Sequence, residues 1–308
     1  MSTTARLVVL AVLAAIVAAM WGLAVVSKRF ERVAAGVAAL DTRVFDRLTV
    51  VVVGSGGSFE NPQRGGPAVG VGRGGTLLLV DAGRAVAEGL RAAEVPAHQP
   101  RAVLLSSLAA ENVLGLDDLW LTGWLGPRAE PLRVLGPAGT GELVEGLRRA
   151  HAEAARVEGV AWALPSEGGR LEARTLAPGD TLELGGIRVR TAALGGAGLP
   201  ALGYRFEADG RAVVVATAGR DPEAVVGLAR GADVLVVEAV VGAALDAARE
   251  AGVERLEVLE EEAARHPRLE EVGDWAARAG VDTLVLTRLR PPPVFASQYT
   301  ARVGGGFR

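Results

Sequence analysis

The sequence predicts an α/β protein: a four-layer αββα sandwich, with two β-sheets back to back and helices on both outer faces, preceded by one N-terminal transmembrane helix. Three observations predict this. The chain has 308 residues, enough to bury a sizeable core. It opens with a long uncharged apolar run. Each half of the remainder passes from β-hairpins into alternating helical and strand segments, which is typical of mixed sheets covered by helices.

The apolar run spans residues 7–26 and contains no charge. As a helix it is long enough to cross a bilayer. Signal-peptide apolar regions are shorter and end in a small-x-small cleavage site, which residues 24–27 match poorly. We therefore predict that residues 1–29 are a membrane anchor (an uncleaved signal), with a cleaved signal peptide as the alternative, and that the chain contacts the membrane through residues 7–26.

The sequence does not decide on which side of the membrane the globular domain lies. One basic residue precedes the run, and Lys28, Arg29 and Arg32 follow it. That charge bias favours a cytoplasmic domain. A signal-like segment is equally compatible with a periplasmic or extracellular one. Residues 30–45 mix apolar and charged residues at helical spacing, so we predict a juxtamembrane helix or linker there and one globular domain from 46 to 308.

The first half of the domain begins with a buried strand at 48–54 and a hairpin of strands at 68–72 and 76–80. Gly70, Gly72 and Gly75 match the spacing of a dinucleotide-binding loop. That motif must open a helix, whereas here the third glycine opens a strand, so we predict a hairpin turn. We then expect a helix near 84–93, strands at 102–105 and 132–135, and helices at 114–124 and from Thr140, as N-cap, to about 157.

The second half repeats this organisation. Hairpins are predicted at 181–192 and 202–216, around Gly185-Gly186 and Asp209-Gly210. Further segments are a helix at 222–229, a strand at 234–237, helices at about 242–265 and 269–279, and a strand at 283–287. The tail after residue 290 has no strong period and reads as loop.

Composition excludes several classes of function. The net charge of −3 gives no support for nucleic-acid binding through phosphate neutralisation. The absence of cysteine excludes thiolate catalysis, disulfides, cysteine zinc sites and iron–sulfur clusters. The only histidines are His98, His151 and His266, so a site built from four or five imidazoles is impossible.

Short pieces spread over residues 48–293 carry a family resemblance. In the first half they are the glycine turn at 53–57, the Asp81-Ala-Gly83 strand end, the segment 115–119 with Trp124, and residues 133–137. In the second half they are residues 201–206, 231–235 with Glu238, and 284–287. Together, in this order, they resemble the metallo-β-lactamase fold superfamily, in its ribonuclease-Z-like and arylsulfatase-like metallo-hydrolase subgroup.

The resemblance implies two metal ions, usually zinc, bound by a His-x-His-x-Asp-His loop and further ligands that leave an open position for hydroxide. Aligned by flanking residues, the metal-ligand positions of the family fall on Ser107, Ala109, Glu111, Asn112, Gly195, Ala218 and Arg288, with Val237 at a further one. None of the three histidines falls on such a position. We therefore predict a vestigial pocket with no catalytic residue, no metal and no other cofactor.

Several residues near these positions have more than one interpretation. Arg288 is expected either to pair with Glu111 or Asp81, its guanidinium replacing the missing metal charge, or to be a solvated surface arginine. Ser106 and Ser107 are predicted as turn residues rather than nucleophiles, because no base aligns nearby.

Carboxylates and histidines complete the set of candidates. Glu111 with Asp117 and Asp118 could bind a hard cation, although acids at a helix N-terminus more simply complement its dipole. His266 is expected to have a capping or surface role, and His98 and His151 to face solvent.

The sequence thus predicts a membrane-anchored protein of this fold with a degenerate metal site, acting as a non-catalytic binding, scaffolding or regulatory pseudoenzyme. Its partner would be an unidentified protein or active relative. The alternative is a metallo-hydrolase-like enzyme that cleaves phosphodiesters or esters through a non-standard site. Fold alone does not decide between them.

Overall fold

The computed structural model describes residues 3–37, 39–58, 61, 63–126, 128–195, 198–254, 256–291, 299 and 303. The chain divides into two compact units, Met1–Asp41 and Thr42–Arg308. Most of the tail that was predicted to be loop lies outside the described residues.

The first unit is formed by the helix α1 (Thr3–Val37). It contains one stretch, Val12–Glu31, that is long and apolar enough to cross a membrane, a property that a signal sequence near the N-terminus shares. No part of that stretch is buried. In the segment predicted as a juxtamembrane helix or linker, 30–45, α1 continues to Val37 and Phe45 already begins the first strand.

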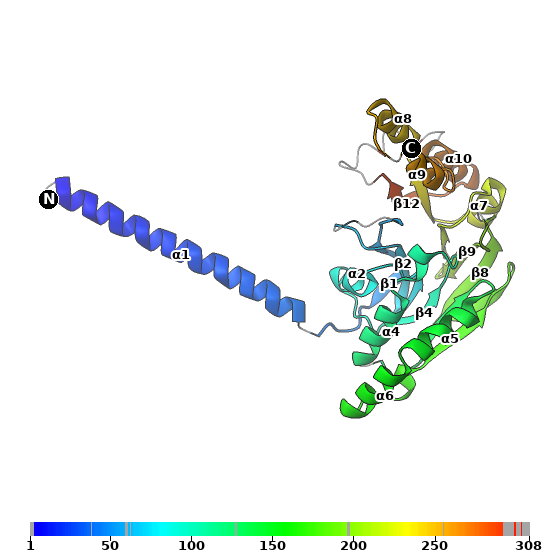
Figure 1. Ribbon diagram of the computed structural model, residues 1–308, viewed down its shortest axis with the longest axis horizontal. Helices are drawn as coiled ribbons and strands as arrows, with labels where there is room; N and C mark the ends of the chain where they lie inside the picture. Colours follow the sequence, from blue (N-terminus) through cyan, green and yellow to red (C-terminus); the bar gives the residue numbers. More distant parts are fainter. Residues whose placement is uncertain are drawn as a thin grey trace. The chain divides into compact units, whose positions relative to one another are not determined.

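The second unit contains two six-stranded sheets (Figure 1). The first has its strands in sequence order: β1 (Phe45–Gly54), β2 (Ala68–Gly74), β3 (Thr76–Val80), β4 (Pro100–Leu104), β5 (Leu132–Gly136) and β6 (Leu171–Thr175). Strands β3 to β6 are parallel, whereas β1–β2 and β2–β3 pair antiparallel. The hairpin predicted in place of a dinucleotide loop is confirmed, since Arg73 pairs with Thr76 across it.

The second sheet has the order β12-β11-β10-β9-β8-β7. Its strands are β7 (Thr181–Leu184), β8 (Ile187–Ala193), β9 (Leu202–Ala208), β10 (Arg211–Ala216), β11 (Val234–Val240) and β12 (Thr283–Arg290). Strands β10, β11 and β12 are parallel, and the others pair antiparallel. Polar side chains can therefore gather at the C-terminal ends of the parallel strands in each sheet.

Strand alternation divides the apolar residues into three layers of core, because successive side chains point to opposite faces. Leu78 and Val80 pack between the sheets, against Tyr204 and Phe206 of the second sheet. Leu77 and Leu79 of the same strand point outwards to a separate cluster. The predicted αββα sandwich is confirmed.

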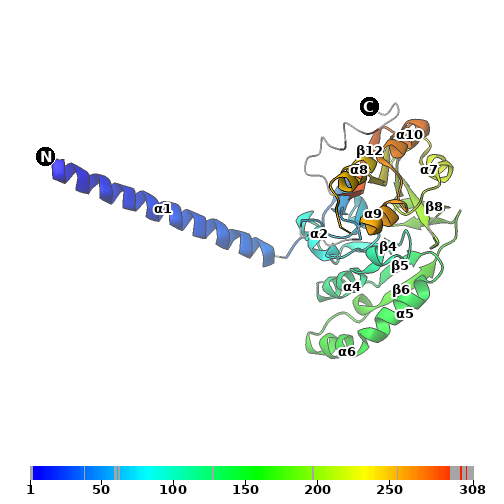
Figure 2. The same cartoon turned by 45° about the horizontal axis from the view of Figure 1, so that its top comes forward.

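Helices cover the two outer faces (Figures 1 and 2). On the first sheet lie α2 (Val86–Ala92), α4 (Leu116–Leu125) and α5 (Thr140–Ala150), which bury side chains in its outer cluster. On the second lie α7 (Pro222–Ala229) and α10 (Leu269–Ala279). The remaining short elements are α3 (Ala110–Val113), α6 (Ala152–Ala161), α8 (Gly242–Glu250), α9 (Leu256–Ala263) and the 3-10 turn η1 (Glu167–Gly169).

Local predictions fail at element ends. The helix expected from 140 to 157 breaks at His151 into α5 and α6, and its N-cap is Gly139, with φ 97°. The helix expected at 242–265 is α8 and α9, separated after Gly252, whose φ of 64° is left-handed and ends α8. Strand β6 was not predicted, because only its first residue, Leu171, is buried and no apolar alternation marks it.

Candidate functional site

A polar pocket lies at the C-terminal ends of parallel strands from both sheets. Asp81 follows β3, Ser107 follows β4, and Thr217 follows β10. Glu238 lies in β11 and Arg288 in β12, the two neighbouring strands. Loops at this end of parallel strands are where α/β proteins usually bind ligands, so the topology alone selects this place.

The pocket has a volume of about 260 Å³. It is lined by Ser58, Ser107, Ala109, Ala110, Glu111, Asn112, Leu114, Leu199, Thr217, Ala218, Glu238, Arg265, His266 and Arg288. All predicted positions except Gly195 and Val237 are among these residues. Gly195 instead forms a turn with φ 63°, its carbonyl accepting from the Arg220 N–H at 3.4 Å. Val237 is fully buried in the outer core of the second sheet.

Arg288 lines the buried floor of the pocket and is 2% exposed. Its Nη2 donates to the carboxylate of Asp81 and, at 3.2 Å, to Thr217 Oγ1. Its Nη1 lies 3.4 Å from Glu111 Oε1. The prediction that Arg288 pairs with Glu111 or Asp81 is confirmed for both acids, and the alternative of a surface arginine is wrong.

A second arginine, Arg290, completes the cluster and was not predicted from the sequence. Its Nη2 lies 2.9 Å from Glu111 Oε2, and its Nη1 lies 3.4 Å from Glu238 Oε2 and 2.9 Å from the carbonyl oxygen of Arg288. The signal was present in the sequence, because residues two apart on a strand point to the same face. Arg288-x-Arg290 therefore directs two guanidinium groups to one side of β12.

His266 joins the same cluster from the segment between α9 and α10. Its Nδ1 lies 3.0 Å from Glu238 Oε2, and its side chain is only 11% exposed. The side chain is therefore not on the surface, although the His266 N–H does donate to the Ala263 carbonyl at the end of α9, at 3.1 Å. The contact joins residues distant in the chain, so no local pattern could have indicated it.

Burial and the neighbouring positive charges shift the pKa values of the buried acids in opposite directions. Burial raises the pKa of Asp81 to about 6, against the opposing effects of Arg288 and of hydrogen bonds from Ser106. Burial also opposes ionisation of Glu238, but the hydrogen bond from His266 and the arginine charges hold its pKa below its ordinary value. The three acids keep the pKa of Arg288 above its ordinary value despite its burial. At neutral pH the floor is thus a charged ion-pair network.

The serines of the loop after β4 support this network. The Ser106 N–H and hydroxyl each donate to Asp81 at 2.7 Å. Asn112 Nδ2 donates to Ser107 Oγ at 2.8 Å. Both serines therefore hold the loop after β4 in place through hydrogen bonds to neighbouring polar side chains.

The acids near α4 do not converge on one cation. Glu111 binds the arginines, Asp117 lies 3.1 Å from His151, and Asp118 accepts from Thr122 at 3.0 Å. His151 is consequently half-buried rather than solvent-facing. Within the described ranges, no group of three or more His, Cys, Asp or Glu side chains is placed to hold a metal ion.

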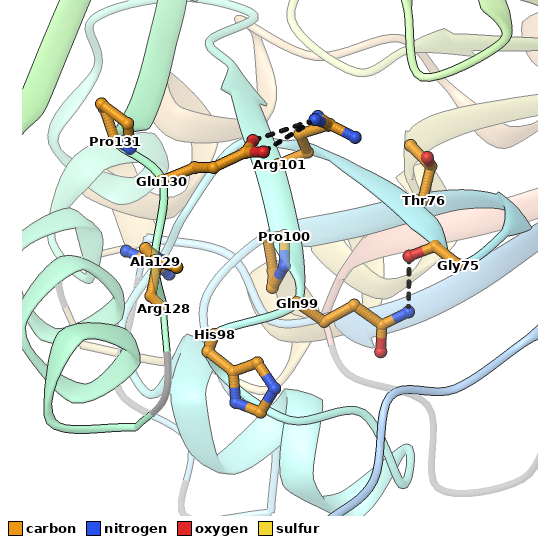
Figure 3. Close-up of a pocket in the computed structure, with 10 residues that line it drawn as sticks. All are labelled: Gly75, Thr76, His98, Gln99, Pro100, Arg101, Arg128, Ala129, Glu130 and Pro131. Carbon is orange, nitrogen blue, oxygen red and sulfur yellow. Dashed lines mark hydrogen bonds and ion pairs between the residues drawn. The ribbon is translucent and has the colours of Figure 1, made fainter. Parts of the chain in front are cut away.

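A second pocket, of about 200 Å³, lies at the opposite ends of β3, β4 and β5 (Figure 3). Arg101 and Glu130 pair at 2.9 Å on one side of it, and Gln99 donates to the Gly75 carbonyl at 3.3 Å. Arg128 is buried there, and its guanidinium donates to main-chain carbonyls. His98, predicted to face solvent, is partly buried, and burial lowers its pKa. The pocket that contains Arg288 is the better candidate, because it lies at the C-terminal ends of the parallel strands, where α/β proteins usually bind ligands.

The fold and the position of this pocket define a class of protein, and the comparisons agree with it. The chain belongs to the beta-lactamase superfamily: the domain described by that name matches residues 76–287. Ribonuclease Z of Mycobacterium bovis is 30% identical over 248 residues, covering 79% of this chain and 86% of the relative. Ribonuclease Z of Mycolicibacterium paratuberculosis is 31% identical over 253 residues, covering the same shares.

Solved structures share the fold at lower identity. The metallo-beta-lactamase fold protein YhfI of Bacillus subtilis has a TM-score of 0.61 at 19% identity, covering 85% of this chain and 95% of its own. The short form of human tRNase Z has a TM-score of 0.60 at 19% identity, covering 78% and 92%. The chain is therefore related to ribonuclease Z in sequence and fold, which does not by itself assign an activity.

Proposed function

We propose that this chain is a membrane-attached member of the superfamily that has lost its metal site and acts by binding rather than by catalysis. One observation carries the proposal: a buried arginine, Arg288, pairs with Asp81 and Glu111 at a position where the family resemblance places a metal ligand. An arginine stays protonated at any physiological pH and offers no lone pair to a metal. Its positive charge compensates the same carboxylates that would have to act as ligands of a metal ion.

The residues present do not fit the two metal ions of the family. A zinc site needs three or four side chains of the His, Cys, Asp or Glu type, converging on one point. Asp81, Glu111 and Glu238 are arranged around guanidinium groups instead. A divalent cation in this pocket would be repelled by Arg288 and Arg290 at short range. We therefore derive no reaction step through a metal.

A hydrolase is the second candidate, and two observations favour it. The relatives at about 30% identity are named Ribonuclease Z, so phosphodiester hydrolysis is the reaction to test first. The pocket also contains the His266–Glu238 pair, at 3.0 Å, an arrangement that suits general acid–base catalysis. Such an enzyme would use a non-standard site.

Metal analysis and turnover assays on the full-length chain in detergent separate the two candidates. We expect elemental analysis to find no stoichiometric zinc, manganese or iron, and we expect no turnover of bis(p-nitrophenyl) phosphate or p-nitrophenyl acetate. Stoichiometric metal would overturn the proposal. So would turnover that is lost in His266→Ala but kept in Arg174→Ala, a matched variant at an exposed arginine of β6.

Membrane attachment through residues 7–26 is part of the proposal and is supported by the exposed apolar stretch of α1. N-terminal sequencing of the mature protein tests it, because a cleaved signal peptide would remove that stretch. No charge pattern supports a nucleic-acid partner, and we propose a protein or small-molecule partner instead.

A further inference from the structure

The floor of the pocket is electrically satisfied by its own residues. Its three carboxylates face two guanidinium groups and an imidazole, all of them within the ion-pair network: Asp81, Glu111, Glu238, Arg288, Arg290 and His266. A ligand ion that entered the pocket would have to compete with these pairs. The side chains that select a ligand must therefore lie outside this ion-pair network.

The rim offers such groups. Arg265 lines the pocket, is exposed, and forms no ion pair or hydrogen bond with another described residue. Leu114, between α3 and α4, is 62% exposed, and Leu199, between β8 and β9, is 46% exposed. Both leucines line the same pocket, one from each half of the domain. Exposed apolar side chains beside a charged group at a concave site are typical of ligand recognition.

We propose that the pocket binds a small monoanion with an apolar body: a carboxylate paired with Arg265 and an apolar group against Leu114 and Leu199. This inference rests on the proposed binding function and names its ligand class. The volume of about 260 Å³ limits the ligand to a small molecule. A ligand with several negative charges is disfavoured, because Glu111 and Glu238 also line the pocket.

The test is ligand-observed NMR on the full-length protein in detergent, with 3-phenylpropionate as the probe. The matched probes are 3-phenylpropanol, which lacks the charge, acetate, which lacks the apolar body, and inorganic phosphate. We expect 3-phenylpropionate to bind at least tenfold more tightly than each of the others, since loss of either the charge-assisted contact or the apolar contact costs about a factor of ten.

Substitutions of Arg265 and Leu114 test whether these two side chains contact the probe. Arg265→Gln and Leu114→Ser should each weaken 3-phenylpropionate binding about tenfold, with unchanged melting temperatures because both side chains are exposed. The matched control Arg47→Gln, at an exposed arginine in β1, should leave binding unchanged.

Three results would overturn the ligand class: no binding by any probe, equal binding of the alcohol, acetate or phosphate, or full binding by Arg265→Gln. Each of these leaves the metal-free binding protein standing if the metal and turnover assays are negative. Stoichiometric metal would instead overturn the proposed function, whatever the probes show.

Discussion

Arg288 and Asp81 form a buried ion pair although both residues have left-handed backbone conformations, with φ of 48° and 65°. Such conformations cost non-glycine residues about 1–2 kcal/mol each. Asp81 ends a strand of the first sheet and Arg288 lies in a strand of the second. The pair therefore ties the two sheets together at the pocket, and its attraction offsets strain on both sides.

Replacing Arg288 by alanine should lower the free energy of unfolding by about 3 kcal/mol, because it leaves Asp81 as an uncompensated buried charge. Chemical denaturation of the full-length protein in detergent, followed by tryptophan fluorescence, measures this. Arg174→Ala, the exposed control, should change stability by less than about 0.5 kcal/mol. If Arg288→Ala had the same free energy of unfolding as the wild type, the stabilising role of the Arg288–Asp81 ion pair would be rejected.

A double substitution separates charge from packing. Asp81→Asn combined with Arg288→Met removes both charges and keeps most of the buried volume. It should recover part of the stability lost in Arg288→Ala, since a buried pair can be replaced by neutral groups at little cost. The explanation would be contradicted if the double variant lost more free energy of unfolding than the two single variants lose together.

Metal should have no effect on stability. If guanidinium groups have replaced the metal ions, excess EDTA should leave the melting temperature of the full-length protein unchanged, and excess zinc should not raise it. A ligand that binds only the folded state raises its stability by mass action, so thermal melts with zinc are a sensitive check. A saturable upward shift with zinc, abolished by EDTA, would point to a metal site after all.

The layers of the fold could be predicted from the sequence because they rest on local periodicity. Leu77 to Val80 is apolar throughout, which indicates a strand buried on both faces, and the structure divides these residues between two cores. The failures lie where periodicity says little. His151 and Gly252 interrupt helical patterns that looked continuous, and β6 buries only Leu171.

The site was predictable where the flanking segments resemble the family, which includes strand ends and also Glu111, Asn112 and Arg288. Ser107 and Ala218 lie just beyond strand ends, so flanking residues place them correctly in the pocket. The partnership of His266 with Glu238 depends on how the segment between α9 and α10 folds back over β11. Loop conformation of this kind has no period, and the sequence alone therefore could not reveal it.

The raised pKa of Asp81 predicts a specific pH dependence. Because its pKa is about 6 in the folded protein and 3.8 when unperturbed, the folded state binds a proton more readily than the unfolded state. This residue alone should therefore make folding more favourable as pH falls from 7 to 5, by about 1 kcal/mol.

The wild type and Asp81→Asn should be unfolded by urea at both pH values. Acids that do not interact with Asp81 contribute equally to both proteins and cancel in the difference, so only the wild type should gain this increment. If the wild type and Asp81→Asn differ in free energy of unfolding by the same amount at pH 7 and at pH 5, the pKa of Asp81 is not raised.

The final prediction concerns the glycine that holds Asp81 in place. A Cβ atom on Gly83 would lie 2.4 Å from the Pro67 nitrogen, closer than any real contact, so this loop cannot accept a side chain without moving. Gly83→Ala should destabilise the protein by about 1–3 kcal/mol or more. Gly146→Ala, on the open face of α5, should instead stabilise it by about 0.5–1 kcal/mol. Because the displaced loop also carries Asp81 away from Arg288, the effects of Gly83→Ala and Arg288→Ala should not add; strict additivity would show that the glycine and the ion pair are independent.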